Sequence, residues 1–142
     1  MKKNLFLFAL LLFAATMSAQ NGIIGKWKTI DDETGKAKSV VEIYEKSGKI
    51  YGKIIELLDT ADKNKTCEAC LGEDKGKPIL ALTIIKGLQK DGSDYSNGKI
   101  LDPKNGKLYK CTITLEEKDK LKVRGYIGFS VLGRSQFWSR VK

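Results

Sequence analysis

The sequence has 142 residues, with 26 lysines and arginines against 17 acids, no histidine and a formal net charge of +9. This length suits one domain, and the absence of histidine excludes Ser-His-Asp and Cys-His catalysis and removes the commonest metal ligand. The excess charge is mostly lysine, scattered along the chain and interleaved with acids, so we predict no nucleic-acid partner, which would favour clustered arginines or aromatics. A solvated lysine-rich surface explains it, and affinity for anionic envelope surfaces is the functional alternative.

The first residues have the three parts of a signal peptide. Lys2 and Lys3 give the positive start, residues 5–15 form an unbroken apolar run, and Met17-Ser18-Ala19 offers small residues at the cut. A bilayer-spanning helix needs roughly 20 apolar residues, so the run is too short to be a transmembrane anchor. We predict cleavage after Ala19 (signal peptide 1–19), with no lipoprotein cysteine after the cut, and a periplasmic or secreted mature protein.

The mature chain, residues 20–142, has 123 residues and a net charge of +7. Short segments of alternating apolar and polar residues are separated by turns, as in Asp102-Pro103-Lys104-Asn105-Gly106, which is the pattern of antiparallel strands. The predicted strands are residues 25–30, 39–45, 49–57, 79–88, 94–101, 107–115, 120–126 and 136–141. Residues 59–77 form a polar excursion between two of them.

These eight segments predict an all-β fold. One-sided alternation buries one face of the sheet, and a flat sheet of this length would leave two exposed edges. Closure removes the edges, so we expect a single antiparallel up-and-down β-barrel of about eight strands, lipocalin-like, over residues 20–142. A sandwich of seven or eight strands is the alternative.

Residues near the two ends of the mature chain suit the closure of a barrel. Gly25-Lys26-Trp27 begins the first predicted strand, and Arg134, Trp138 and Arg140 accompany the last one. A broad indole can seal an open end while a guanidinium stacks on its face and donates to free carbonyls. We therefore predict that Trp27, with Arg134 or Arg140 and with Trp138, closes the barrel. This G-x-W with a late arginine resembles the signature of the lipocalin and fatty-acid-binding superfamily.

Longer motifs resemble one secreted bacterial family, the domain of unknown function 2147. They are Trp27-Lys28-Thr29, Thr34-Gly35-Lys36, Tyr51-Gly52-Lys53-Ile54, Cys67-Glu68-Ala69-Cys70, Ile100-Leu101-Asp102-Pro103, Leu121-Lys122-Val123-Arg124-Gly125-Tyr126-Ile127-Gly128 and Leu132-Gly133-Arg134-Ser135-Gln136-Phe137-Trp138. The resemblance spans nearly the whole mature chain. It implies a small exported domain with a calycin-like barrel and no assigned activity.

Three cysteines allow several interpretations. Cys67 and Cys70 form a C-x-x-C in the polar loop, and three cysteines without histidine are too few for a four-ligand zinc site, so no metal is expected. A thiol-disulfide centre is disfavoured because Glu68 and the acids that follow would raise the thiol pKa. A bond from either cysteine to Cys111 would close a longer loop. Since Cys111 lies on an apolar face, we predict a structural Cys67–Cys70 disulfide and a buried free thiol at Cys111.

One cluster of acids remains, Asp31-Asp32-Glu33. It could bind calcium or act in acid–base chemistry, but it falls in a predicted turn without further oxygen ligands, so a solvated turn is the expectation. We predict no catalytic residue and no cofactor.

The sequence favours a non-enzymatic binding protein for a small apolar or amphipathic ligand in the cell envelope. Two alternatives stay open: an envelope thiol-disulfide protein using Cys67 and Cys70, and a filled barrel acting as a structural or protein-interaction module. The ligand, its contact residues, the oligomeric state and the choice between periplasm and cell exterior are not determined by the sequence. A cavity of roughly 300 Å³ or more would favour the ligand-binding protein.

Overall fold

The computed structural model describes residues 22–129 and 132–142, so the predicted signal peptide lies outside the described residues. Strands make up most of the described chain, with two 3₁₀ turns, η1 (Thr60–Asp62) and η2 (Gly72–Asp74). The strands are β1 (Gly25–Ile30), β2 (Ala37–Lys46), β3 (Lys49–Leu57), β4 (Thr83–Asp91), β5 (Asp94–Asp102), β6 (Lys107–Glu117), β7 (Lys120–Tyr126) and β8 (Gly133–Arg140).

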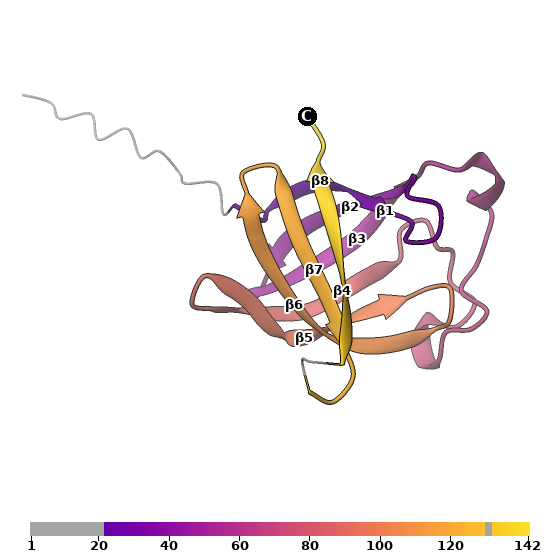
Figure 1. Cartoon of the computed structure of the whole chain (residues 1–142). Helices are drawn as coiled ribbons and strands as arrows, with labels where there is room; N and C mark the ends of the chain where they lie inside the picture. The colour runs from indigo at the N-terminus through magenta and orange to yellow at the C-terminus, as the bar shows by residue number, and fades with distance from the viewer. Residues whose placement is uncertain (1–21, 130–131) are drawn as a thin grey trace, which may run out of the picture.

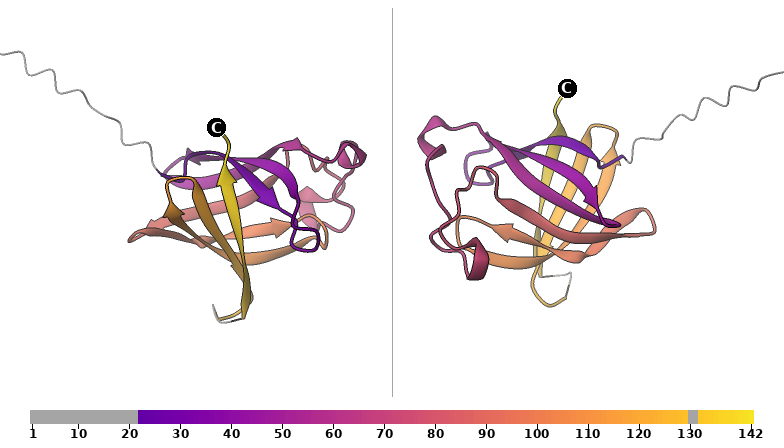
Figure 2. Two further views of the ribbon diagram at one scale, coloured as in Figure 1. Left: turned by 45° about the horizontal axis from the view of Figure 1, so that its top comes forward. Right: turned by 180° about the vertical axis from the view of Figure 1, so that it is seen from behind.

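Each strand pairs antiparallel with its neighbours in the chain, and β1 pairs with β8, so the sheet closes on itself. The closing register is short, with Trp27 opposite Arg140 and Lys28 opposite Ser139. Figures 1 and 2 show the strands wrapping around one interior. The predicted eight-stranded barrel is confirmed and the sandwich alternative is wrong, because no sheet edge between β1 and β8 is left open.

The predicted strand at residues 79–88 begins too early. Ala81 has a φ of 75°, which is left-handed backbone, and the chain enters the ladder only at Thr83. Before that point it makes irregular bonds to β3, from Ala81 N to Ile54 O and from Ile54 N to Leu82 O. The last strand, by contrast, begins at Gly133, three residues before the predicted start at Gln136. Alternation alone does not reveal either boundary.

The two ends of the barrel differ. The turns at residues 47–48, 92–93 and 118–119 lie at one end, together with residues 22–24, and we call this the closed end. The connections 31–36, 58–82 and 103–106, together with residues 127–129 and 132, lie at the other end, which we call the mouth. Apart from Cys67 and Cys70 in the β3–β4 loop, the side chains with almost no exposed surface cluster toward the closed end of the barrel: Ile23, Trp27, Val41, Ile43, Ile85, Leu88, Cys111, Ile113 and Leu121. The core therefore occupies one half of the interior.

Candidate functional site

Trp27 and Arg140 lie together at the closed end. The Trp27 side chain is completely buried, and the Arg140 guanidinium lies 4.2 Å from the centre of its ring. Arg140 donates to the backbone oxygens of Gly22, Ile24 (3.2 Å) and Lys118 (3.0 Å). The indole Nε1 of Trp27 donates to Ile23 O at 2.9 Å. The guanidinium thus stacks on the indole and satisfies carbonyls that no strand partner reaches, which are the two contacts expected of a barrel-closing pair.

Arg134 lies at the opposite end of the same strand. It points inward at the mouth, where its Nε is 3.0 Å from an Asp32 carboxylate oxygen, and its side chain is 68% exposed. Of the two arginines considered from the sequence as the partner of Trp27, the structure places Arg140 there and Arg134 far from it. The reason is periodicity: residues 134, 136, 138 and 140 share the inward face of β8, so the row runs from mouth to closed end.

Trp138 is the third residue of this inward row. It is buried, lines the interior cavity and donates from Nε1 to the Gln136 amide oxygen at 3.1 Å. It thus stands between the packed core and the open space above it. Its position is that of a cavity wall, rather than the barrel end where Trp27 lies.

A cavity of about 980 Å³ occupies the half of the barrel toward the mouth. Its depth is mainly apolar, from Ile54, Leu57, Ile84, Ile100, Val123 and Trp138. Polar side chains that interrupt this lining include Thr29 and Ser39, whose hydroxyls lie 2.6 Å apart, and Gln136. An apolar cavity of this size with a few polar groups is typical of small-molecule sites. The volume exceeds the roughly 300 Å³ that favours a ligand-binding protein. Alternation along the strands accounts for the inward positions of Ile54 and Val123, whereas Leu57, three residues after Ile54, reaches the same cavity because of a β-bulge opposite Val40 and Val41.

The mouth is ringed by ion pairs that sequence reasoning missed. Asp32 pairs with Arg134 and also accepts from the Gln136 amide at 2.9 Å, while Glu33 pairs with Lys104 across 2.7 Å. Residues 31–33, predicted as a solvated turn, belong to the β1–β2 loop. Through these ion pairs they link that loop to β8 and to the β5–β6 turn. Nothing in the local pattern signals these pairs, since the partners are 71 or more residues apart.

The pKa directions at the mouth follow from these contacts. The backbone N–H of Thr34 is the chief cause that lowers the pKa of Asp31, with a further contribution from the N–H of Glu33. Hydrogen bonding to Glu33 raises the pKa of Lys104, and hydrogen bonding to Asp62 raises that of Lys65. Each group is thereby held in its charged form at neutral pH.

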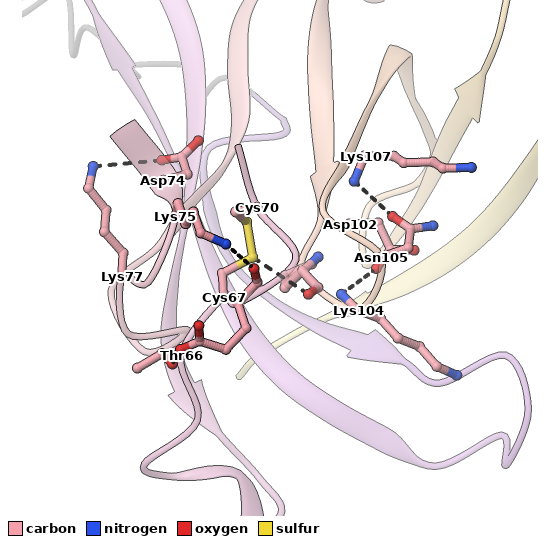
Figure 3. Close-up of a disulfide and its surroundings, with 12 residues drawn as sticks. Thr66, Cys67, Cys70, Asp74, Lys75, Lys77, Asp102, Lys104, Asn105 and Lys107 are labelled. Atoms are coloured by element: carbon pink, nitrogen blue, oxygen red, sulfur yellow. Dashed lines mark hydrogen bonds and ion pairs between the residues drawn. A yellow bond between two sulfur atoms is a disulfide. The ribbon is translucent and has the colours of Figure 1, made fainter. Parts of the chain in front are cut away.

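The polar loop between β3 and β4 contains a disulfide between Cys67 and Cys70, with their Cα atoms 5.3 Å apart. Neither cysteine has any exposed surface. Figure 3 shows the disulfide beside the β5–β6 turn that includes Lys104 and Asn105. Gly106 in this turn has a φ of 72°, and a Cβ there would lie 1.9 Å from Ala69 O, so only glycine allows this approach. The disulfide loop is therefore docked against one side of the mouth.

Cys111 is the free cysteine of the described residues, and it is buried among the inward side chains of β6. Desolvation raises its pKa to about 12, so the thiolate needed for nucleophilic or redox chemistry is scarce at neutral pH. Within residues 22–129 and 132–142, no group of three or more Cys, Asp or Glu side chains is arranged to hold a metal ion. The same part of the chain has no helix with the length and apolar character required to cross a bilayer.

Comparison with known proteins agrees with this geometry. The model of the domain of unknown function 2147, described as an uncharacterised protein conserved in bacteria, matches residues 25–140. Among solved structures the chain is similar to protein HP1028 from Helicobacter pylori, which is described as belonging to the lipocalin family. The TM-score is 0.74 at 21% identity, over 84% of this chain and 82% of that one. No curated protein matches.

The structural match establishes the lipocalin-like fold. It shows nothing about function, because the sequence identity is too low. The family match, by contrast, runs from the first strand of the barrel to the last. This chain therefore belongs to the bacterial family of the domain of unknown function 2147.

Proposed function

We propose that this protein is exported and, without catalysing a reaction, binds a small apolar or amphipathic molecule in the cell envelope, within the barrel cavity. The observation that carries the proposal is the cavity of about 980 Å³ above a fully packed closed end. Burial of apolar ligand surface at about 25 cal/mol per Å² would supply the affinity. Gln136 and the Thr29–Ser39 pair offer hydrogen bonds to a polar group on the ligand.

The cavity favours this function over a filled barrel acting only as a structural module. The alternative of thiol-disulfide exchange has less support, because attack needs an accessible sulfur and both Cys67 and Cys70 are fully buried. HP1028 is described as a lipocalin-family protein, and its fold is in keeping with a binding role here.

The test is ligand recovery and ligand exclusion. Lipid extraction or native mass spectrometry of the purified protein should reveal a bound small molecule. A fluorescent fatty-acid analogue should bind to the protein, and the extracted molecule should displace it. Leu57→Trp adds bulk at a partly exposed position of the cavity wall and should weaken binding at least about tenfold, since it competes for the same volume.

Leu108→Trp is the matched control, because Leu108 is 48% exposed and does not line the cavity. It should bind the probe like the parent protein. Absence of any co-purifying molecule together with no probe binding, or equal binding by both tryptophan variants, would contradict the proposal.

A further inference from the structure

The net charge of the protein resides in one part of the sequence. Residues 20–102 contain fourteen basic and fourteen acidic side chains, whereas residues 103–142 contain ten basic side chains and only three acidic ones, Glu116, Glu117 and Asp119, all near the β6–β7 turn at the closed end. The expectation that lysines are interleaved with acids therefore holds only for the first part of the chain. The second part contains β6, β7 and β8, so the unbalanced positive charge lies on neighbouring strands of one wall.

Several of these cations face outward. Leu121 and Val123 of β7 are buried, so the intervening Lys122 and then Arg124 take the outer face, and on β6 the exposed Lys110, which precedes the buried Cys111, takes the same face. The Lys120 ammonium lies 4.8 Å from the ring of Phe137, which is itself exposed on the outer face of β8. We call these four cations, Lys110, Lys120, Lys122 and Arg124, the basic wall.

An apolar tip adjoins the basic wall at the mouth. Ile127, Phe129 and Leu132 follow β7, with 62%, 81% and 68% of their surface exposed. Backbone bonds from Ile127 N to Leu132 O and from Leu132 N to Phe129 O hold them close together. Figures 1 and 2 show this end of the β7–β8 hairpin projecting beyond the neighbouring strands. Exposed large apolar side chains that gather in one place indicate an interaction surface.

The apolar tip connects the basic wall to the cavity. Lys110 Nζ donates to Gly128 O at 3.4 Å, which places a wall cation at the base of the tip. Ile127 and Leu132 also line the cavity, so apolar surface continues from the outside of the protein to its interior. This combination matches a lipid bilayer with anionic headgroups, since apolar side chains insert below the headgroups while lysines contact them.

We infer that the apolar tip and the basic wall dock the protein on an anionic lipid bilayer, so that the mouth opens toward the membrane. This inference rests on the proposed function, because it gives the cavity ligand a direct route between bilayer and barrel. An acidic protein partner would use the wall, but it would not explain why exposed apolar residues continue into the cavity.

The test uses the exported protein, purified after processing and checked by mass spectrometry, in sedimentation with vesicles. Vesicles of equal parts phosphatidylglycerol and phosphatidylcholine should bind it, pure phosphatidylcholine vesicles should bind it weakly, and added salt should reduce binding. Phe129→Ser should weaken binding about tenfold or more. Leu71→Ser is its control: Leu71 is also 81% exposed, but it does not line the cavity and its β3–β4 loop contains none of the cations of the basic wall.

The charge contribution has its own pair of variants. Lys110→Glu with Lys122→Glu should weaken anionic-vesicle binding about tenfold or more. Lys46→Glu with Lys90→Glu makes the same change in net charge at exposed positions toward the closed end and should have much less effect.

Equal binding by Phe129→Ser and Leu71→Ser, salt-insensitive binding to both vesicle types, or capture by polyglutamate beads without vesicle binding would overturn the inference. Titration of the fluorescent fatty-acid analogue without vesicles tests the proposed function independently of the membrane-docking inference. A protein that binds the analogue but no vesicle contradicts only membrane docking. One that binds vesicles but no small molecule contradicts only the ligand cavity.

Discussion

The two ends of this barrel use the same kinds of side chain for different purposes. At the closed end Arg140, which is 20% exposed, stacks on a buried indole, donates to backbone carbonyls and pairs with Asp119, whereas at the mouth Arg134, which is 68% exposed, pairs with Asp32. Burial decides the difference, because a guanidinium removed from water must satisfy its donors, while an exposed one exchanges partners with solvent at little cost. The closed end therefore supplies stability, and the mouth is left adaptable.

The largest expected effect tests the two tryptophans. Trp27→Ala should destabilise the protein by about 3–5 kcal/mol, because it opens a cavity in a fully packed region. Trp138→Ala should cost less, about 2 kcal/mol, because that side chain already borders open space. Urea unfolding followed by circular dichroism measures both. Equal losses for the two variants would mean that the interior is not divided into a packed half and a hollow half.

The second effect compares the two arginines. Arg140→Ala should lose about 2–3 kcal/mol, since it removes the stacking contact and leaves several carbonyls without a donor. Arg134→Ala should lose about 0–1 kcal/mol, as expected for an exposed ion pair. The same unfolding experiment applies. A larger loss for Arg134→Ala than for Arg140→Ala would mean that Arg140 is not the arginine that closes the barrel.

The smallest effect concerns the mouth alone and depends on pH. The folded protein lowers the pKa of Asp31 below its ordinary value of 3.8, chiefly through the Thr34 N–H. The Asp31 carboxylate therefore stabilises the fold above its unfolded pKa, and this stabilisation is lost as the pH falls through the lower folded value. Asp31→Asn should remove that part of the acid dependence while leaving the remainder unchanged. The measurement is the urea midpoint of the parent protein and of Asp31→Asn as the pH is lowered. If the difference between the two midpoints stays constant into the acid range, Asp31 is not responsible for this part of the acid dependence.

Much of the fold can be predicted from local pattern. Alternation in residues 107–115 and 120–126 correctly assigns Cys111, Val123 and their neighbours to the inner face, because a strand has a period of two. The C-x-x-C spacing in an expected oxidising compartment correctly indicates the Cys67–Cys70 disulfide. Boundaries are less accessible, as Ala81 shows, since its left-handed backbone depends on bonds to β3 rather than on residue type.

The candidate site is predicted less completely. Alternation accounts for part of the cavity lining, but Leu57 lines it through a β-bulge, and the Asp32–Arg134 and Glu33–Lys104 pairs join segments that are distant in sequence. Such pairs depend on where the closed sheet brings its loops, and no motif encodes them. The clustering of charge on β6, β7 and β8 is visible in the sequence only once the strands are known to be neighbours on one wall.

The sequence alone indicated an antiparallel β protein with one apolar face, a disulfide in its longest loop and a tryptophan at the start of its first strand. These are local properties, set by side-chain period, residue spacing and composition. Only the tertiary structure decided which arginine meets that tryptophan, how much of the interior stays empty, and that an apolar tip borders the opening. Those properties depend on the register at which β1 meets β8, because sheet closure brings together side chains more than a hundred residues apart.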